Sequence, residues 1–120
     1  MNIEQLYDYC LKKKGVTETF PFDNNTLVLK VLGKMFLLTS LKGWEEGKPA
    51  INLKCDPTEA ENLRANYDNI IPGYHMSKKH WNTLKLNQGD LENALVLQLI
   101  DHSYDLVVKG VPKKLRDTLG

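Results

Sequence analysis

The chain has 120 residues, of which 42% are hydrophobic and 26% are charged, as expected of one globular domain that buries its own core. Its net charge of +1 excludes a strongly basic overall surface, and no apolar run approaches the ~20 residues that a membrane-spanning helix needs. The N-terminus shows no basic stretch followed by an apolar run, so we expect no secretory signal. The sequence therefore predicts a single domain over residues 1–120 in a cytoplasmic protein without membrane contact.

The first predicted element is a helix that starts after Asn2. Asn2 is a good N-cap, and Gln5 follows three residues later as in a capping box. The lysines at positions 12–14 crowd the last turn before Gly15, and we interpret them as a solvated C-terminal cap. The apolar residues recur at helical spacing, namely Ile3, Leu6, Tyr7, Cys10 and Leu11.

Three strands are predicted next. Residues 26–31 and 35–41 are rich in strand formers, and Gly33-Lys34 between them suits a tight hairpin turn. We expect the two aromatic rings of Phe20-Pro21-Phe22 to pack under the sheet. After a loop, residues 50–55 alternate apolar and polar side chains, which predicts a strand with one buried face and one wet face.

The second half begins with a strong helix start, Asp56-Pro57-Thr58-Glu59, which combines a cap, a proline at the first position and an acid three residues later. Residues 70–74 predict a short strand at a sheet edge, because Pro72 cannot donate a ladder hydrogen bond. Residues 83–86 predict another strand, and Asp90 is positioned to cap a long last helix. The apolar face of that helix comprises Leu95, Val96, Leu99, Ile100, Leu106 and Val107.

Consecutive strands joined by short loops indicate an antiparallel sheet with helices over one face. The predicted fold is thus a two-layer α+β domain with the element order α-β3-α-β2-α.

The sequence offers little chemistry for catalysis. His75 and His80 lie five residues apart and His102 is distant, so no spacing typical of a zinc site is present. Cys55 precedes a helix start, but it has no readable partner base, and Ser103 has no nucleophile-elbow context. No glycine-rich phosphate loop occurs. We expect a protein that is not an enzyme and that has no metal or cofactor.

Two cysteines are present, Cys10 and Cys55. They show neither a disulfide framework nor a CxxC pattern, and each falls on a predicted apolar face. We expect both to be buried free thiols in a reducing compartment.

The stretch 69–89 concentrates positive charge. It contains three lysines and no Asp or Glu, so it carries +3 while the rest of the chain sums to −2. Lysines pair with phosphates and aromatic rings stack on bases, although Trp81 could instead fill the core and leave the lysines idle. The candidate nucleic-acid-binding residues are Lys54, Tyr74, His75, Lys78, Lys79, His80, Trp81 and Lys85.

Two adjacent stretches, Pro72-Gly73-Tyr74-His75-Met76 and Lys78-Lys79-His80-Trp81-Asn82-Thr83, resemble the most recognisable block of the MmcQ/YjbR family of small bacterial proteins. Leu53-Lys54-Cys55-Asp56-Pro57 and Ser103-Tyr104-Asp105-Leu106-Val107 extend this resemblance, whereas Ser77 stands where the family commonly has asparagine. The resemblance implies a fold like that of secretion chaperones or frataxin, and DNA binding through a double-wing arrangement of the sheet. It implies no catalytic residues.

We therefore predict a non-enzymatic protein that binds DNA weakly and with little sequence preference, as a monomer or weak dimer. The alternative is a protein-interaction or chaperone-like module without a nucleic-acid role, because antiparallel sheet edges commonly pair with partner segments.

Overall fold

The structure is a computed structural model, and it describes residues 1–89 and 91–120. The helices are α1 (Ile3–Leu11), α2 (Leu41–Glu45), α3 (Pro57–Asn66), α4 (Asn93–Lys109), α5 (Lys113–Arg116) and the 3-10 helix η1 (Asp117–Leu119). The strands are β1 (Val16–Thr19), β2 (Thr26–Val31), β3 (Lys34–Ser40), β4 (Ala50–Lys54), β5 (Ile70–Pro72) and β6 (Trp81–Lys85).

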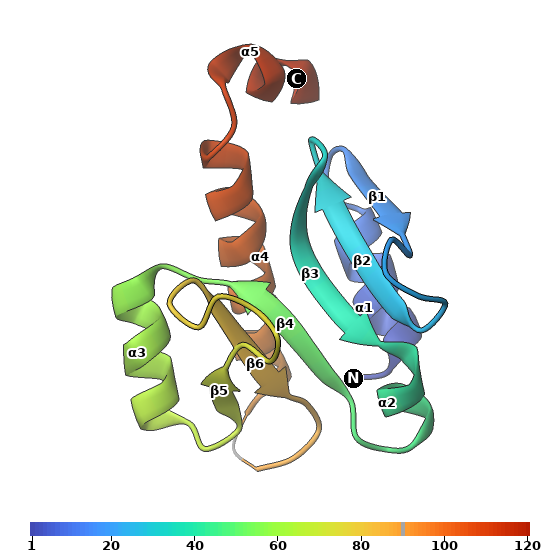
Figure 1. The fold of residues 1–120 in the computed structure, drawn as a ribbon, viewed down its shortest axis with the longest axis vertical. Helices are drawn as coiled ribbons and strands as arrows, with labels where there is room; N and C mark the ends of the chain where they lie inside the picture. Colours follow the sequence, from blue (N-terminus) through green and yellow to red (C-terminus); the bar gives the residue numbers. More distant parts are fainter. Residues whose placement is uncertain (90) are drawn as a thin grey trace.

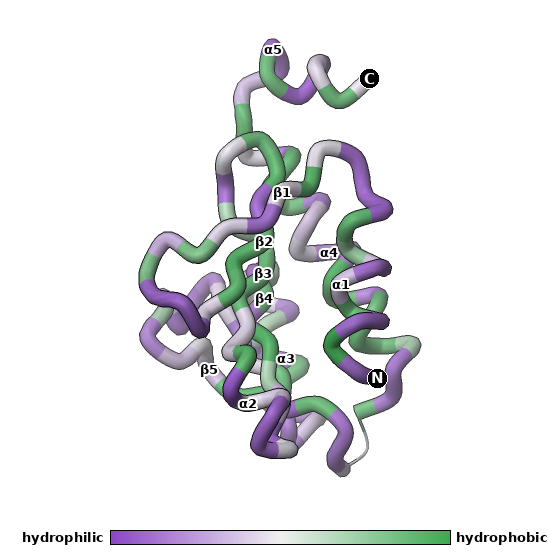
Figure 2. Tube along the Cα trace, turned by 90° about the vertical axis from the view of Figure 1, so that its right-hand side faces the viewer, coloured by the Kyte–Doolittle hydropathy of each residue, from purple (hydrophilic) through white to green (hydrophobic). Residues whose placement is uncertain are grey.

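The strands form one six-stranded antiparallel sheet in the order β1-β2-β3-β4-β6-β5. Helices α1 and α4 lie behind this sheet in Figure 1 and to one side of it in Figure 2, so the domain has two layers. The predicted α+β class is confirmed, and β5 lies at an edge as expected from its proline. Strand β1 and helix α2 are additions to the predicted order.

Local sequence signals fix where two helices begin. Asn2 Oδ1 accepts from Gln5 N (2.8 Å) and Gln5 Oε1 accepts from Asn2 N (2.9 Å), which confirms the capping box of α1. Asp56 Oδ2 likewise accepts from Glu59 N (3.2 Å) at the start of α3. The predicted cap of α4, Asp90, lies outside the described residues.

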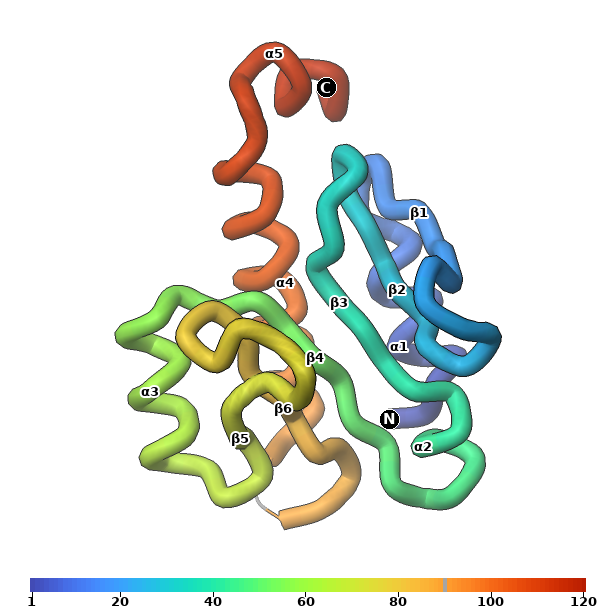
Figure 3. Tube along the Cα trace, in the orientation of Figure 1, coloured from blue at the N-terminus to red at the C-terminus, as the bar shows by residue number. Residues whose placement is uncertain are grey.

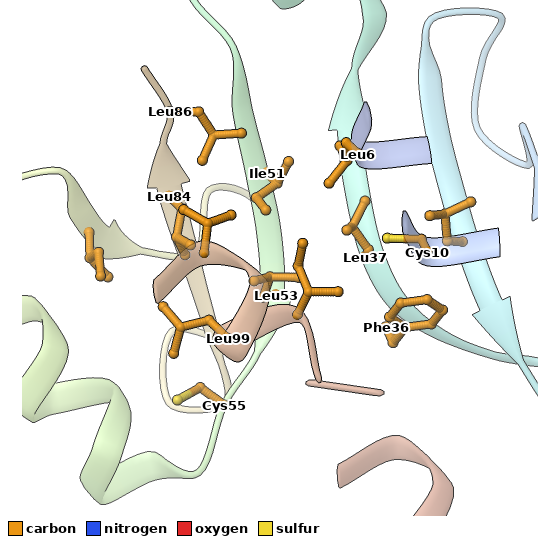
Figure 4. Close-up of a cluster of buried hydrophobic side chains, with 14 of the residues drawn as sticks. Leu6, Cys10, Phe36, Leu37, Ile51, Leu53, Cys55, Leu84, Leu86 and Leu99 are labelled. Atoms are coloured by element: carbon orange, nitrogen blue, oxygen red, sulfur yellow. The ribbon is translucent and has the colours of Figure 1, made fainter. Parts of the chain in front are cut away.

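The main core fills the space between the sheet and the helices (Figure 4). Phe36 and Leu37 from β3 and Ile51 from β4 are fully buried there. Both cysteines belong to this core, which confirms that they are buried and free. No helix of the described chain is long and apolar enough to cross a membrane.

A smaller apolar cluster lies on the other face of the sheet, which we call the open face because α1 and α4 do not cover it. It consists of Val28, Leu38 and Trp81, with Met35 and Met76 packed against it. The connection between β5 and β6, residues 73–80, contributes Met76 and passes in front of the sheet in Figure 3. We call this connection the cover loop.

Two local predictions are wrong, and a third is confirmed only in part. The hairpin turn is centred on Leu32 and Gly33, both at positive φ (53° and 78°), one residue earlier than expected. Phe20 and Phe22 are 42% and 64% exposed and do not pack under the sheet. Lys12 is the C-cap of α1, which ends at Leu11, and Lys12 and Lys14 are exposed as predicted. Lys13 is not simply solvated, because its Nζ pairs with Asp101 at 2.6 Å.

Candidate functional site

The cover loop is held in place by its own backbone and by α3. Gly73 N donates to Trp81 O (2.9 Å), and Ser77 O accepts from the backbone N–H of both His80 and Trp81 (3.2 and 2.9 Å). Arg64 Nη1 donates to Lys78 O (3.1 Å) and to the buried Asn82 Oδ1 (2.8 Å). The loop is therefore fixed over the sheet.

Strand register places several lysines on the open face. Lys30 is paired with Met35, Lys54 with Trp81, and Lys85 with Ala50. Because side chains alternate between the faces of a strand, these lysines share the face of the apolar cluster. None of the other described strand positions on this face is Asp or Glu. These positions are Thr17, Thr19, Thr26, Val28, Met35, Leu38, Ser40, Ala50, Asn52, Ile71, Trp81 and Thr83.

The cover loop adds Lys78 and Lys79, both exposed. Lys78 Nζ lies 3.4 Å from Gly73 O, so it also helps to close the loop. The lysines predicted as one binding set thus lie on the open face and on the loop that covers it, and Lys30 joins them.

The four candidate rings divide into exposed and buried ones. Tyr74 is 69% exposed, and its ring lies 4.0 Å, centroid to centroid, from the exposed His75 ring. His75 has a φ of 57°, a left-handed conformation that is uncommon outside glycine. His80 is exposed as well, whereas Trp81 is only 9% exposed. The Trp81 ring is therefore shielded from ligands, because it packs against Val28 and Leu38 on the open face.

A groove of about 470 Å³ lies on the open face, between the cover loop and the β1–β2 connection. Its floor comes from β2, β3 and β4. Phe22 lines it on one side, and Tyr74, His75 and Met76 line it on the other; the floor residues are Thr26, Leu38, Thr39, Ser40 and Asn52.

A chain of hydrogen bonds fixes how Asn52 faces the groove. Tyr74 N donates to Thr83 Oγ1 (3.1 Å), and Thr83 Oγ1 in turn donates to Asn52 Oδ1. The oxygen of the Asn52 amide is thus the atom turned toward Thr83, whose hydroxyl both accepts and donates. Asn52 Nδ2 has no hydrogen-bond partner among the described residues. Its two N–H groups are therefore available as donors.

The Phe22 side of the groove is tied down by an acidic turn. Asp23 Oδ1 accepts from Thr26 N (2.6 Å) and Asn25 N (2.8 Å), and these backbone bonds hold the pKa of the Asp23 carboxyl below its usual value. Asn25 Nδ2 also donates to Ser40 Oγ (2.8 Å). Phe22 is thus exposed on a connection whose following residues are anchored to β3.

The side chains considered for catalysis are occupied or shielded. Burial raises the pKa of the Cys55 thiol to about 11, with Glu59 and Asp56 adding to the shift. Ser103 is fully buried and hydrogen-bonded. His102 Nε2 accepts from Asp56 N (3.3 Å), consistent with a structural histidine at the core edge.

Sequence reasoning missed Lys30, Asn52 and Phe22 as members of this surface. The alternation of side chains along β2 and β4 predicts the face of Lys30 and of Asn52, because each stands two residues from another open-face residue. No signal in the sequence distinguishes Phe22, which lines the groove, from Phe20, which lines a hollow on the helix side with Ile3 and Tyr7.

Comparison with known proteins finds one family and several similar proteins that agree with one another. The sequence model of the YjbR family matches residues 11–106. The uncharacterised protein YjbR of Escherichia coli is 32% identical over 119 residues, which cover 99% of this chain and 98% of that protein. The uncharacterised protein YbdF of Escherichia coli is 40% identical over 95 residues, 79% of this chain and 75% of that protein.

A crystal structure of a Deinococcus radiodurans protein with a DUF419 domain superposes with a TM-score of 0.88 at 39% identity, covering 99% of this chain and 88% of that one. Family sequence, full-length relatives and fold agree along most of the chain. The chain therefore belongs to the YjbR family.

Proposed function

We propose that this protein is a non-enzymatic cytoplasmic DNA-binding protein that uses its open face and cover loop. The observation that carries this proposal is the distribution of charge. The strand positions of the open face include lysines and, among those described, no carboxylate, and the cover loop adds Lys78 and Lys79. The protein as a whole has a net charge of only +1, so the open face and the cover loop are more positive than the rest of the chain.

Lysines on a sheet and on a loop above it are suited to contact phosphates, which position a nucleic acid without reading its sequence. Lys54 and Lys85 lie on neighbouring strands, and the cover loop stands between the sheet and solvent. We expect weak binding with little sequence preference, because few phosphates are contacted.

The state of two candidate nucleophiles, one buried and one hydrogen-bonded, supports the non-enzymatic part of the proposal. The raised pKa of Cys55 disfavours a thiolate at neutral pH. Ser103 Oγ already donates to one backbone carbonyl and accepts from one backbone N–H, so it is not poised to attack a substrate.

The test is the salt dependence of binding to a labelled duplex, followed by fluorescence anisotropy. Contacts from Lys78, Lys79 and Lys85 to three phosphates predict a slope of about −2.7 in log K against log salt. The Lys78→Ala/Lys79→Ala protein should bind more weakly, with a slope reduced by about 1.8. A slope near zero for the wild type would refute the proposal.

A charge-matched control is available in Lys12→Ala/Lys14→Ala. Both residues are exposed and follow α1, in the helix layer away from the open face. This control should bind DNA as the wild type does. Equal losses in the two double variants would mean that overall charge, and not the open face, drives binding. Absence of binding by the folded protein at low salt would favour the protein-interaction alternative.

A further inference from the structure

The groove on the open face exposes aromatic rings. Binding to the phosphates of a duplex requires cations and does not require such rings. Phe22 and Tyr74 are the most exposed of the large hydrophobic side chains, at 64% and 69%, and they line opposite sides of the groove. His75 stands beside Tyr74 on the same side. Rings held exposed around one hollow form a place where a flat ligand can stack.

Both aromatic sides are anchored before any ligand arrives. The Tyr74 backbone is fixed to β6 by its hydrogen bond to Thr83 (3.1 Å). The connection after Phe22 is fixed by the Asp23 turn and by Asn25, which bonds Ser40. A ligand therefore finds anchored walls, which lowers the entropy cost of binding.

The floor of the groove supplies directed hydrogen-bond donors. Because Asn52 Oδ1 already accepts from Thr83, the groups of this amide that have no partner among the described residues are its two N–H groups. A ligand that satisfies them must carry acceptors, such as the carbonyl oxygen of a pyrimidine or of guanine. The volume of about 470 Å³ lies within the ~300–1,000 Å³ range of small-ligand sites.

Lysines flank this floor on the same face. Lys54 is two residues from Asn52 along β4, about 7 Å away at the usual strand rise, and Lys85 is paired with Ala50 on the other side. A base on the floor would thus have lysines at nearby strand positions on the same face for its backbone phosphates. In a duplex the ring faces are already stacked, so only an unpaired base can present its face to Phe22 or Tyr74.

We propose that the groove binds one unpaired nucleobase of single-stranded DNA, stacked against Phe22 and Tyr74 and hydrogen-bonded through a carbonyl oxygen to Asn52 Nδ2. This inference rests on the proposed function, and it narrows the DNA-binding role to single strands.

The experiment compares the affinity for a labelled thymidine oligonucleotide with that for the corresponding duplex. The oligonucleotide has about 12 nucleotides, within the ~4–16 that one single-strand-binding fold covers. The variant is Phe22→Leu/Tyr74→Leu, which removes the rings but no charge. Both side chains are exposed, so the fold should persist. The matched control is Phe20→Leu, an exposed phenylalanine that lines the helix-side hollow.

The wild type should prefer the single strand to the duplex. The double variant should lose that preference, with affinity for the single strand falling on the order of tenfold or more, while the control keeps it. The salt slope should not change in the double variant, because its lysines are intact. Replacing the thymines by difluorotoluene, which has the shape of thymine but no carbonyl oxygen, should weaken binding to the wild type.

The outcomes separate the two proposals. Salt-dependent binding that is equal for single strand and duplex and indifferent to Phe22→Leu/Tyr74→Leu would overturn the base-binding groove and leave the proposed function standing. Lack of binding to either DNA at low salt would overturn both. Equal affinity for thymine and difluorotoluene strands would overturn the role given to Asn52.

Discussion

Ser103 Oγ on α4 donates a 2.6 Å hydrogen bond to the backbone carbonyl of Phe36 on β3. The same oxygen accepts from Lys54 N on β4 at 2.9 Å. The ladder between these strands ends at the pair Leu37 and Leu53, so Ser103 replaces the next rung with a side chain from the helix layer. Beyond it the two strands separate, as Figure 1 shows.

We predict that Ser103→Ala destabilises the protein by about 1–3 kcal/mol, because it leaves a buried carbonyl and a buried N–H without a partner. Urea unfolding followed by circular dichroism measures this. Ser77→Ala, at an exposed position, should stay within about 0.5 kcal/mol of the wild type. A Ser103→Ala protein as stable as the wild type would show that the strands close without the bridge.

Gly73 is required by close packing and not by its backbone angles. A Cβ at this position would lie 2.8 Å from Trp81 Cβ and 3.0 Å from Trp81 O. Gly73→Ala should therefore destabilise the protein by about 1–3 kcal/mol, since the cover loop must shift. In thermal unfolding, the control Gly110→Ala should have little effect, because Gly110 has a φ of −77° and its nearest neighbour is 3.4 Å away. Equal melting temperatures for both variants would contradict this packing argument.

The three consecutive lysines after α1 should differ in their contribution to stability. Lys13 Nζ lies 2.6 Å from Asp101 and near the rings of Tyr9 (5.3 Å) and Tyr104 (5.2 Å). We expect Lys13→Met to cost about 1 kcal/mol of stability, reduced by high salt. Lys12→Met, at an exposed position, should cost much less. The two variants can be compared by urea unfolding at low and high salt, and indistinguishable values would refute the assignment.

Buried thiols should make the protein less stable in alkali. Burial, partly opposed by Lys13, raises the pKa of Cys10 from 9.0 to about 12. Between these values the unfolded chain releases a proton that the folded chain keeps, so this contribution to stability is complete below pH 9 and is lost as the pH rises toward 12. The loss is about 1.4 kcal/mol per pH unit.

Unfolding free energies measured across this range for the wild type and Cys10→Ala would check the prediction. The variant should start less stable, because it leaves a cavity, but should show a shallower alkaline decline. Parallel declines in the two proteins would mean that Cys10 does not contribute to it.

Short-range signals in the sequence predict much of the fold. The capping box at Asn2 and the Asp56-Pro57 start depend on residues within one turn, so they are readable and are confirmed. Strand β1 was missed because its four residues include one apolar side chain, Val16, and it is held by pairing with β2. Helix α2 is five residues long and begins at a cap, Ser40, inside what reads as a continuous strand.

The site was only partly readable, because it depends on which face each side chain occupies. The basic and aromatic character of 69–89 was visible, and the structure places its lysines at or over the open face. The burial of Trp81 depends on contacts with Val28 and Leu38 from distant strands, and the orientation of Asn52 depends on Thr83. Neither relationship leaves a pattern in the order of residues.

Binding of single-stranded DNA to the open face can be tested directly by titrating isotope-labelled protein with the oligonucleotide and following the backbone and side-chain amide shifts by NMR. We predict that the Asn52 side-chain amide and the backbone amides of Tyr74, Thr83 and Lys54 shift together, and that those of α1 stay in place. Shifts confined to the helix layer, or the absence of shifts on the open face at saturating DNA, would contradict it.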